Sequence, residues 1–282
     1  MNNSPIYDPG IPRNYYDNFG EKEWTRLSRD CFGELLFHVH MDVFRCYVNK
    51  EAAVLELGAG AGIFSKELVT LAGQLVVSDI SEEQLVINKS KMTELELADC
   101  IKDFLILDIT DLKEIGDNQY DVVICVGGAL NYTFDKEQEA ITEMQRVTKP
   151  GGIVIVGAVA LFNSLMRFLP AIAEEKQQFG IDATKWLMDK GIQDAEHYPV
   201  ENGNYLHMMR SDDLDALFES QNVQIIEKRA AGIFSLAGDD ALNQAKADKE
   251  VWDLLLSKEI KFSKEPAYLD CGANLIYVAR KL

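Results

Sequence analysis

Three closely spaced glycines constrain this chain most, because they stand between a short apolar run and an amphipathic stretch. The segment reads Glu56-Leu57-Gly58-Ala59-Gly60-Ala61-Gly62, and the helical pattern after it ends at Gly73. This order predicts a strand, a tight turn and a helix. Glycines at such a turn let the backbone bend sharply and approach a ligand without an obstructing Cβ atom. Close packing of the helix on a sheet is the alternative reason for the glycines.

Strand patterns then alternate with helix patterns up to residue 160. Strands are predicted at 74–81, 103–110, 120–128 and 152–160, and helices at 82–92 and 136–148. Ser81 is placed to cap the first of these helices, and Lys149-Pro150-Gly151-Gly152 stops the second. This alternation predicts a parallel sheet with helices on both faces.

The regions on either side of this core follow other patterns. Residues 22–48 have helical periodicity and predict one or two helices, and residues 162–203 are helical without a strand that would extend the sheet. Later segments predict strands at 204–210, 222–233 and 273–282, with helices at 211–221 and 239–258.

We expect two late strands with a hairpin-like connection, and thus a doubly wound, seven-stranded, mostly parallel α/β sheet with a helical cap. The chain is then a single domain made of an N-terminal cap (1–48), a core (49–160), a lid (161–205) and the C-terminal part of the sheet (206–282).

Composition excludes several classes of protein. The 282 residues have a formal net charge of −18 and no concentrated basic patch, which disfavours tight binding to nucleic acid. The five cysteines form no C-x-x-C pair and there are four dispersed histidines, so we expect no metal site. No apolar run reaches the ~20 residues that span a bilayer, and the polar N-terminus lacks the pattern of a signal peptide. A cytoplasmic protein without a membrane partner is expected, and a homodimer stays possible.

Carboxylates stand at the ends of the first three predicted strands. Glu56 lies just before the glycine turn, where it could meet the ammonium group of an amino-acid ligand. Asp79 closes the second strand, where ribose hydroxyls are usually held, and Asp108 closes the third, within reach of the amine of a base. Open α/β sheets bind ligands at this edge.

These residues together resemble the class I S-adenosylmethionine-dependent methyltransferases, whose first motif is acidic-x-G-x-G-x-G. The resemblance covers nearly the whole chain and includes R-V-T-K-P-G-G at 146–152 and the aromatic opening N-Y-Y-D-N-F-G-E-K-E-W at 14–24. It implies S-adenosylmethionine as the cofactor and methyl transfer by in-line displacement. A nicotinamide-binding fold is disfavoured because its third glycine would fall on Ile63, and no G-K-[ST] follows for a phosphate-binding loop.

The resemblance also implies roles for individual residues. Gly58, Gly60 and Gly62 would contact the methionine part and the ribose, Asp79 would hold the ribose hydroxyls, and Ile80 would pack on the adenine. Asp108 and the backbone of Ile109 would meet the edge of the adenine, and Val126 and Gly127 would flank the methionyl tail. Tyr15, Tyr16 and Trp24 resemble the aromatic opening that folds over the cofactor, although Trp24 could equally be ordinary core.

The sequence constrains the methyl acceptor less than it constrains the cofactor. Residues 125–132 lack the N/D-P-P-Y motif of methyltransferases that act on planar nitrogens, so a small-molecule acceptor held by the cap is expected. Asn131 is a weak catalytic candidate, because it stands where related members often have a histidine and it is not a base at neutral pH. Tyr132 and His207 are the other weak catalytic candidates, and His197 and Tyr205 are less favoured. The alternatives are a methyltransferase of protein or RNA, or a cofactor-binding protein without transfer activity.

Overall fold

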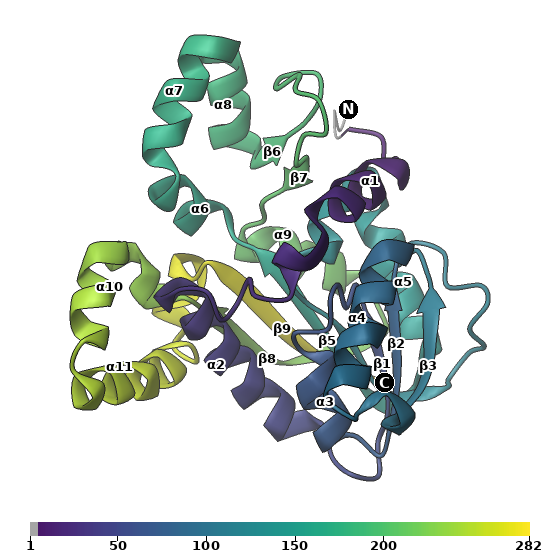
Figure 1. Ribbon diagram of the computed structural model, residues 1–282. Helices are drawn as coiled ribbons and strands as arrows, with labels where there is room; N and C mark the ends of the chain where they lie inside the picture. The colour runs from purple at the N-terminus through teal and green to yellow at the C-terminus, as the bar shows by residue number, and fades with distance from the viewer. Residues whose placement is uncertain (1–4) are drawn as a thin grey trace.

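A seven-stranded sheet forms the centre of the molecule, as shown by a computed structural model that describes residues 5–282 (Figure 1). The strand order is β3-β2-β1-β4-β5-β9-β8, and β9 alone runs antiparallel to both of its neighbours. The doubly wound, mostly parallel α/β sheet predicted from the sequence is therefore confirmed. The strands are β1 (Ala53–Leu57), β2 (Gln74–Asp79), β3 (Ile101–Ile106), β4 (Tyr120–Cys125), β5 (Thr148–Val159), β8 (Val223–Ala231) and β9 (Asn274–Lys281).

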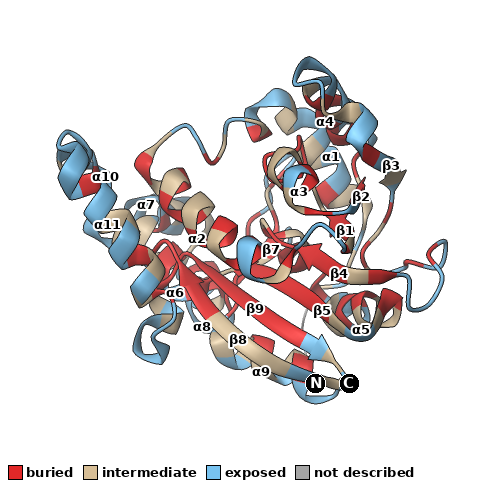
Figure 2. Ribbon diagram, turned by 90° about the horizontal axis from the view of Figure 1, so that it is seen from below, coloured by how far each residue is buried: buried red, intermediate tan, exposed pale blue. Residues whose placement is uncertain are grey.

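Helices cover both faces of the sheet because successive strand residues point to opposite faces. One apolar cluster joins Val54, Val77 and Ile124 to α2 (Cys31–Tyr47), α3 (Ser65–Leu71) and α4 (Glu82–Glu94). A second cluster joins the alternate residues, such as Leu55 and Val123, to α5 (Glu137–Val147) and α9 (Ser211–Glu219). Figure 2 shows the central strands buried between these layers. The Ser81 side chain accepts a hydrogen bond from the Gln84 amide, which confirms the predicted cap of α4.

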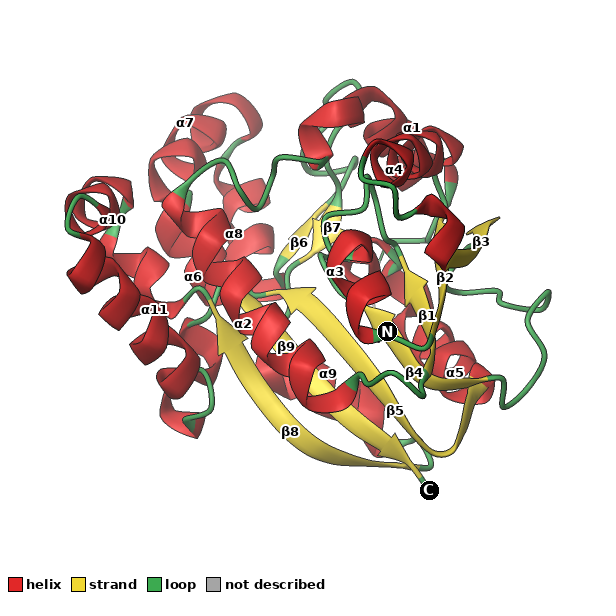
Figure 3. Cartoon of the chain, turned by 60° about the horizontal axis from the view of Figure 1, so that its bottom comes forward, coloured by secondary structure: helices red, strands yellow, loops and turns green. Residues whose placement is uncertain are grey.

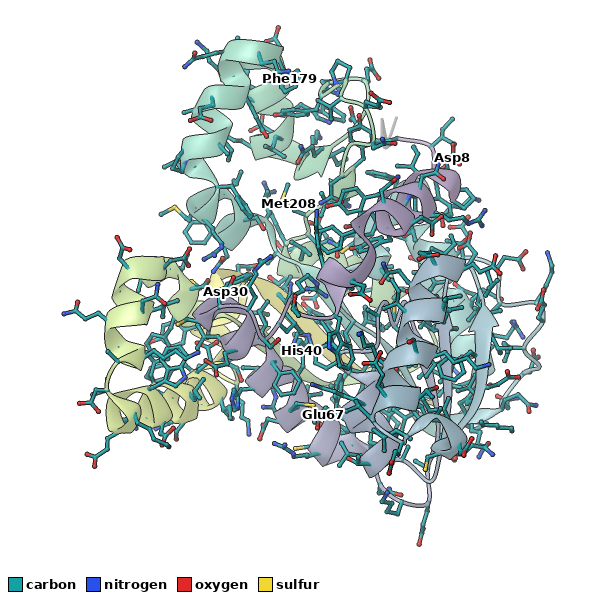
Figure 4. All side chains as sticks on the ribbon, in the orientation of Figure 1. Asp8, Asp30, His40, Glu67, Phe179 and Met208 are labelled. Carbon is teal, nitrogen blue, oxygen red and sulfur yellow. The ribbon has the colours of Figure 1, made fainter. Side chains whose placement is uncertain are left out.

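The cap stands over the edge of the sheet where the parallel strands end (Figure 1). It contains α6 (Leu161–Arg167), α7 (Leu169–Phe179), α8 (Ile181–Lys190) and the short strands β6 (Ile192–Gln193) and β7 (Leu206–His207). Its own apolar cluster includes Ile172, Leu187, Tyr198 and Met208. In Figure 4 Phe179 lies at the outer end of the cap and Met208 at its base.

One strand predicted near the cap is wrong, and one helix was not predicted. The strand expected at 204–210 is only the two-residue β7, which pairs with β6 and not with the main sheet. Its apolar residues are buried in the cap, and such a short apolar run does not distinguish a strand from other buried segments. The N-terminal region holds α1 (Gly10–Phe19), which the sequence did not predict, while residues 24–30 form turns before Asp30 caps α2.

The connection between the last two strands is longer than a hairpin. The single helix expected at 239–258 is divided into α10 (Asp239–Lys246) and α11 (Lys249–Phe262), because Asp248 caps the second one. Figure 3 shows this pair beside α2, beyond the β8 edge of the sheet. The fully buried Glu259 of α11 anchors the pair by accepting hydrogen bonds from the amides of Gly232, Ile233 and Phe234 at 2.8, 2.8 and 3.0 Å.

Two kinds of feature are absent from residues 5–282. None of the helices combines the length and the apolar character needed to cross a bilayer. The described residues also contain no cluster of three or more His, Cys, Asp or Glu side chains that could hold a metal ion.

The Glu259 anchor predicts a large stability effect. Glu259→Ala leaves three backbone N–H groups without their acceptor, so we expect the free energy of unfolding to fall by about 2–4 kcal/mol. Chemical denaturation measures this change. Glu250→Ala, at an exposed position of the same helix, is the matched control and should change stability by no more than about 0.5 kcal/mol. Equal effects of the two substitutions would contradict the anchor.

Candidate functional site

The glycine turn between β1 and α3 has a left-handed backbone. Gly58, Gly60 and Gly62 have φ angles of +65°, +53° and +97°, which other residues rarely adopt. A Cβ atom on Gly58 would lie 2.6 Å from the Cβ of Ala129, and one on Gly62 would lie 2.6 Å from Oδ1 of Asn88. These two glycines therefore permit close packing, while Gly60 faces the N-terminal segment.

Asp79 at the end of β2 holds this turn in shape. Its Oδ2 accepts a hydrogen bond from the Gly60 amide and its Oδ1 accepts one from the Ser81 amide, both at 2.8 Å. The side chain is nearly buried, and desolvation raises its pKa to about 6 despite these hydrogen bonds. The carboxyl group also lines a cavity, so the same group supports the turn and can meet a ligand.

Glu56 lies one strand away and is enclosed by protein. Its Oε2 accepts a hydrogen bond of 2.6 Å from the Ser65 hydroxyl at the start of α3. Burial raises the pKa of Glu56 to about 8, which is far above the ordinary range of a carboxyl group. Glu56 does not line the cavity beside the turn.

We call the space beside the turn the cradle cavity. It measures about 60 Å³ with the side chains as they stand, and its walls come from the N-terminal segment and from the ends of β1, β2, β3 and β4. Eight of the residues singled out from the sequence meet here: Tyr16, Gly58, Gly60, Asp79, Ile80, Ile109, Gly127 and Tyr132.

Besides Glu56, five other residues predicted to contact the cofactor lie outside the walls of the cradle cavity, and one of them, Tyr15, lines only the larger space described below. Asp108 accepts a hydrogen bond of 3.1 Å from the Tyr7 hydroxyl. Trp24 packs against the core with the Lys66 ammonium 5.2 Å from its ring centroid, as the alternative interpretation of this residue expected. Val126 is buried in the same core, and Gly62 faces Asn88.

The N-terminal segment supplies wall residues that the sequence analysis missed. They include an ion pair in which Nε of Arg26 donates to both carboxylate oxygens of Glu23, at 2.9 and 2.8 Å. The aromatic opening at 14–24 signalled that this segment covers the turn, but nothing in it showed which charged side chains point inward. The other missed wall residues are Tyr7, Pro12, Leu107, Ala129 and Thr133.

A second, larger space lies beneath the cap, and we call it the cap cavity. It measures about 450 Å³, within the ordinary range for small-molecule sites of about 300–1,000 Å³. Its lining is mostly apolar and aromatic and includes Phe19, Phe32, Leu165, Phe168, Ile172 and Leu187. The two cavities share one wall, made of Tyr16, Glu23, Arg26, Gly127 and Tyr132.

Two tyrosines form a hydrogen-bonded chain across this shared wall. The Tyr132 hydroxyl donates to Oδ1 of Asn204 at 2.9 Å, and the Tyr16 and Tyr132 hydroxyls lie 3.0 Å apart. If Tyr132 donates to Asn204, Tyr16 must be the donor to Tyr132. Burial raises the pKa of Tyr132 to about 12, so its hydroxyl stays protonated at neutral pH. Both hydroxyl hydrogens are therefore used within this chain, and the two tyrosines offer the wall neutral oxygen acceptors and no tyrosinate base.

The other two weak catalytic candidates lie away from both cavities. Asn131 is fully buried, where its Nδ2 donates to the carbonyls of Val159 and His207 and its Oδ1 accepts from the Val159 amide. These bonds tie the core to the cap, which explains why this side chain does not face a ligand. Nδ1 of His207 pairs with Glu137 at 2.6 Å; burial lowers the pKa of His207, but this partner outweighs it and raises the pKa overall.

Comparison with known proteins relates the core of this chain to methyltransferases. The family described as "Methyltransferase domain" matches residues 54–152. A curated relative, the ubiquinone/menaquinone biosynthesis C-methyltransferase UbiE of Burkholderia cenocepacia, is 28% identical over 148 residues. The match covers 51% of this chain and 56% of that protein, so the chain spans about half the length of the curated relatives it matches.

Solved structures share the fold at low sequence identity. An S-adenosylmethionine-dependent methyltransferase from Methanosarcina mazei has a TM-score of 0.55 at 16% identity, over 85% of this chain and 97% of that one. The cyclase SpnF has a TM-score of 0.52 at 18% identity, over 86% and 80% of the two chains. At these identities the likeness establishes the fold alone.

The raised pKa of Glu56 predicts a pH dependence of stability. A carboxyl group with a higher pKa in the folded state binds more protons there, so the free energy of unfolding falls as pH rises from about 4.5 to about 8. Glu56→Gln keeps an acceptor for Ser65 and removes this titration, so its stability should decline less over that range. Urea denaturation at pH 5 and pH 8 measures the difference. The exposed Glu51→Gln variant is the control and should follow the unmodified chain; equal slopes for Glu56→Gln and the unmodified chain would refute the assignment.

Proposed function

We propose that this chain, which belongs to the class I S-adenosylmethionine-dependent methyltransferases, transfers a methyl group to a small molecule held in the cap cavity. The observation that carries the proposal is the shared wall: the cradle cavity beside the glycine turn adjoins the cap cavity at Gly127 and Tyr132. A donor in the first cavity and an acceptor in the second would meet at this wall.

The residues of the cradle fit S-adenosylmethionine, the cofactor of this family. Gly60 puts no side chain of its own into the cradle, where Glu23 is the group that lies over it, and Asp79 offers carboxylate oxygens for ribose hydroxyls. Ile80, Leu107 and Ile109 supply apolar surface for a flat base. At about 60 Å³ the cavity is narrower than a typical ligand site, so side chains of the N-terminal segment must shift to admit the whole molecule.

The bound cofactor supplies an activated methyl group on a sulfonium ion, so the protein mainly has to align the acceptor and exclude water. The cap and the aromatic residues of α1 enclose the acceptor side. The oxygens of Tyr16 and Tyr132 can orient an N–H or O–H group of the acceptor by accepting a hydrogen bond, because their own hydrogens are used in the Tyr16–Tyr132–Asn204 chain. Among the described residues that line either cavity there is no histidine, lysine or cysteine. The site therefore best fits an acceptor atom that is already nucleophilic and does not need a strong base of the protein to remove a proton.

The cap cavity favours a largely apolar acceptor of small size. Its apolar side chains outnumber its charged ones, and the charged ones include the paired Glu23–Arg26. A relative that is named a C-methyltransferase makes an electron-rich ring carbon one reasonable acceptor atom. A folded protein or an RNA fits poorly beneath α6 and α7, because the cap encloses this space. The net charge of −18 also disfavours binding to RNA.

One alternative deserves a direct test. The cyclase SpnF shares the fold, so this architecture also occurs in a protein named for different chemistry. The lack of a strong base along the shared wall is compatible with cofactor binding without methyl transfer. Binding and transfer must therefore be measured separately.

Cofactor binding and methyl transfer are tested by two measurements. Calorimetry should show binding of S-adenosylmethionine and S-adenosylhomocysteine, and Asp79→Ala should weaken it by about 1–3 kcal/mol because an acceptor for ribose hydroxyls is lost. A transfer assay with a tritiated methyl donor against metabolite extract, protein and RNA should label small molecules. Binding without label in any fraction would favour the alternative, and no binding would refute the proposal.

The acceptor site is tested by filling the cap cavity. Ala171 of α7 lines this cavity, whereas Ala173 of the same helix does not, and both are exposed. Ala171→Trp should lower kcat/KM for the acceptor about tenfold or more because the indole takes the acceptor's space. Ala173→Trp should leave kcat/KM unchanged, and neither variant should alter the affinity for S-adenosylhomocysteine. Equal transfer rates in both variants would place the acceptor elsewhere.

A further inference from the structure

One ion pair crosses the wall between the two cavities. A Cβ atom on Gly60 would lie 3.0 Å from Cγ and 3.5 Å from Oε1 of Glu23, and one on Gly127 would lie 3.3 Å from Nη2 of Arg26. Gly60 belongs to the turn after β1 and Gly127 follows β4. The pair Glu23–Arg26 therefore reaches from one of these loops to the other, directly over the cradle.

The contact between Glu23 and Arg26 uses only part of the hydrogen-bonding capacity of the two side chains. Nε of Arg26 makes both contacts to Glu23, and within residues 5–282 neither Nη nitrogen of Arg26 has a hydrogen-bond partner. A guanidinium group has five N–H donors, so four of them are left over, and each carboxylate oxygen of Glu23 can accept further bonds. The Arg26 side chain is 30% exposed and that of Glu23 is 8% exposed, so the free donors border a partly enclosed space where charge-assisted bonds are strong.

A ligand that complements this pair must carry one negative and one positive group close together. An isolated anion would face the Glu23 carboxylate, and an isolated cation would face the Arg26 guanidinium. An α-amino acid has both groups on one carbon. Glu56, the carboxylate that the sequence analysis assigned to an ammonium group, is bound to Ser65 and does not line the cradle cavity, whereas Glu23 does.

We infer that Glu23 and Arg26 form a clamp for the zwitterionic amino-acid end of the cofactor, with Arg26 binding the α-carboxylate and Glu23 binding the α-ammonium group. The inference rests on the proposed function, because it needs S-adenosylmethionine in the cradle. Asp79, Ile80 and Ile109 would then hold the nucleoside half. The two halves of the ligand would be recognised by separate parts of the chain.

Two ligands separate these halves in a binding experiment. S-adenosylhomocysteine carries the amino-acid tail, whereas 5′-methylthioadenosine has the same nucleoside and sulfur but a methyl group in place of the tail. By calorimetry, Arg26→Gln and Glu23→Gln should each weaken S-adenosylhomocysteine about 10- to 100-fold, because a charged hydrogen-bond partner is lost. Neither variant should change the affinity for 5′-methylthioadenosine by more than about twofold.

Two control variants test whether a loss of affinity comes from the change in net charge or from a change in folding. Arg29→Gln removes the same charge from an exposed side chain three residues away and should leave both affinities unchanged. Each single variant leaves a partner charge near the protein interior, so the double variant Glu23→Gln/Arg26→Gln, which leaves no unpaired charge, is measured as well. It should show the same loss for S-adenosylhomocysteine while its thermal midpoint stays close to that of the unmodified chain.

The outcomes distinguish this inference from the function on which it rests. Unchanged S-adenosylhomocysteine affinity in the double variant would overturn the clamp and leave the proposed function intact. An equal loss for both ligands would also overturn it, because the pair would then act by supporting the fold of the cradle. Failure of the unmodified chain to bind either ligand would instead refute the proposed function.

Discussion

The hydrogen bond from the Gly60 amide to Asp79 is the contact on which the rest of the site depends. It fixes a turn whose three glycines have left-handed φ angles, so the chain can leave β1 and enter α3 without closing the cradle. The same carboxyl group faces the cradle cavity, which means that the geometry of the turn and the polarity of the site cannot vary independently. A parallel sheet brings this turn beside the ends of β2 and β4, and those neighbours complete the cavity.

This arrangement concentrates buried carboxyl groups where they cost stability. Glu56 and Asp79 both have pKa values raised by desolvation, and each is compensated by short hydrogen bonds from neighbouring polar groups. Glu23 is compensated by Arg26. Buried acidic side chains are an unfavourable way to build a core, but the two that line the cradle cavity, Asp79 and Glu23, suit a ligand with hydroxyl groups and a positive charge.

The sequence predicted those features that depend on neighbours along the chain. The period of apolar residues located the seven strands of the main sheet, Ser81 three residues before Gln84 located a helix start, and the glycines located the turn. Contacts between distant segments were not predictable in this way. Tyr7 meets Asp108 and Asn131 meets the His207 carbonyl only after the chain has folded. The two-residue β7 was overestimated because burial in the cap imposes the same apolar pattern as a strand.

The cradle cavity and the cap cavity are formed by different parts of the chain, and this explains why the family is easier to identify than the acceptor. The family match covers 54–152, which includes the turn, Asp79 and Gly127. The cap cavity is lined mainly by residues outside that range, such as Phe19, Phe32, Phe168 and Met208. Only the shared wall belongs to both regions, with Gly127 and Tyr132 from the core and Tyr16 from α1. Under the proposed function, the core can keep one cofactor while changes in α1 and α6–α8 alter which molecule reaches the wall, so the acceptor would be sought from the shape of the cap cavity.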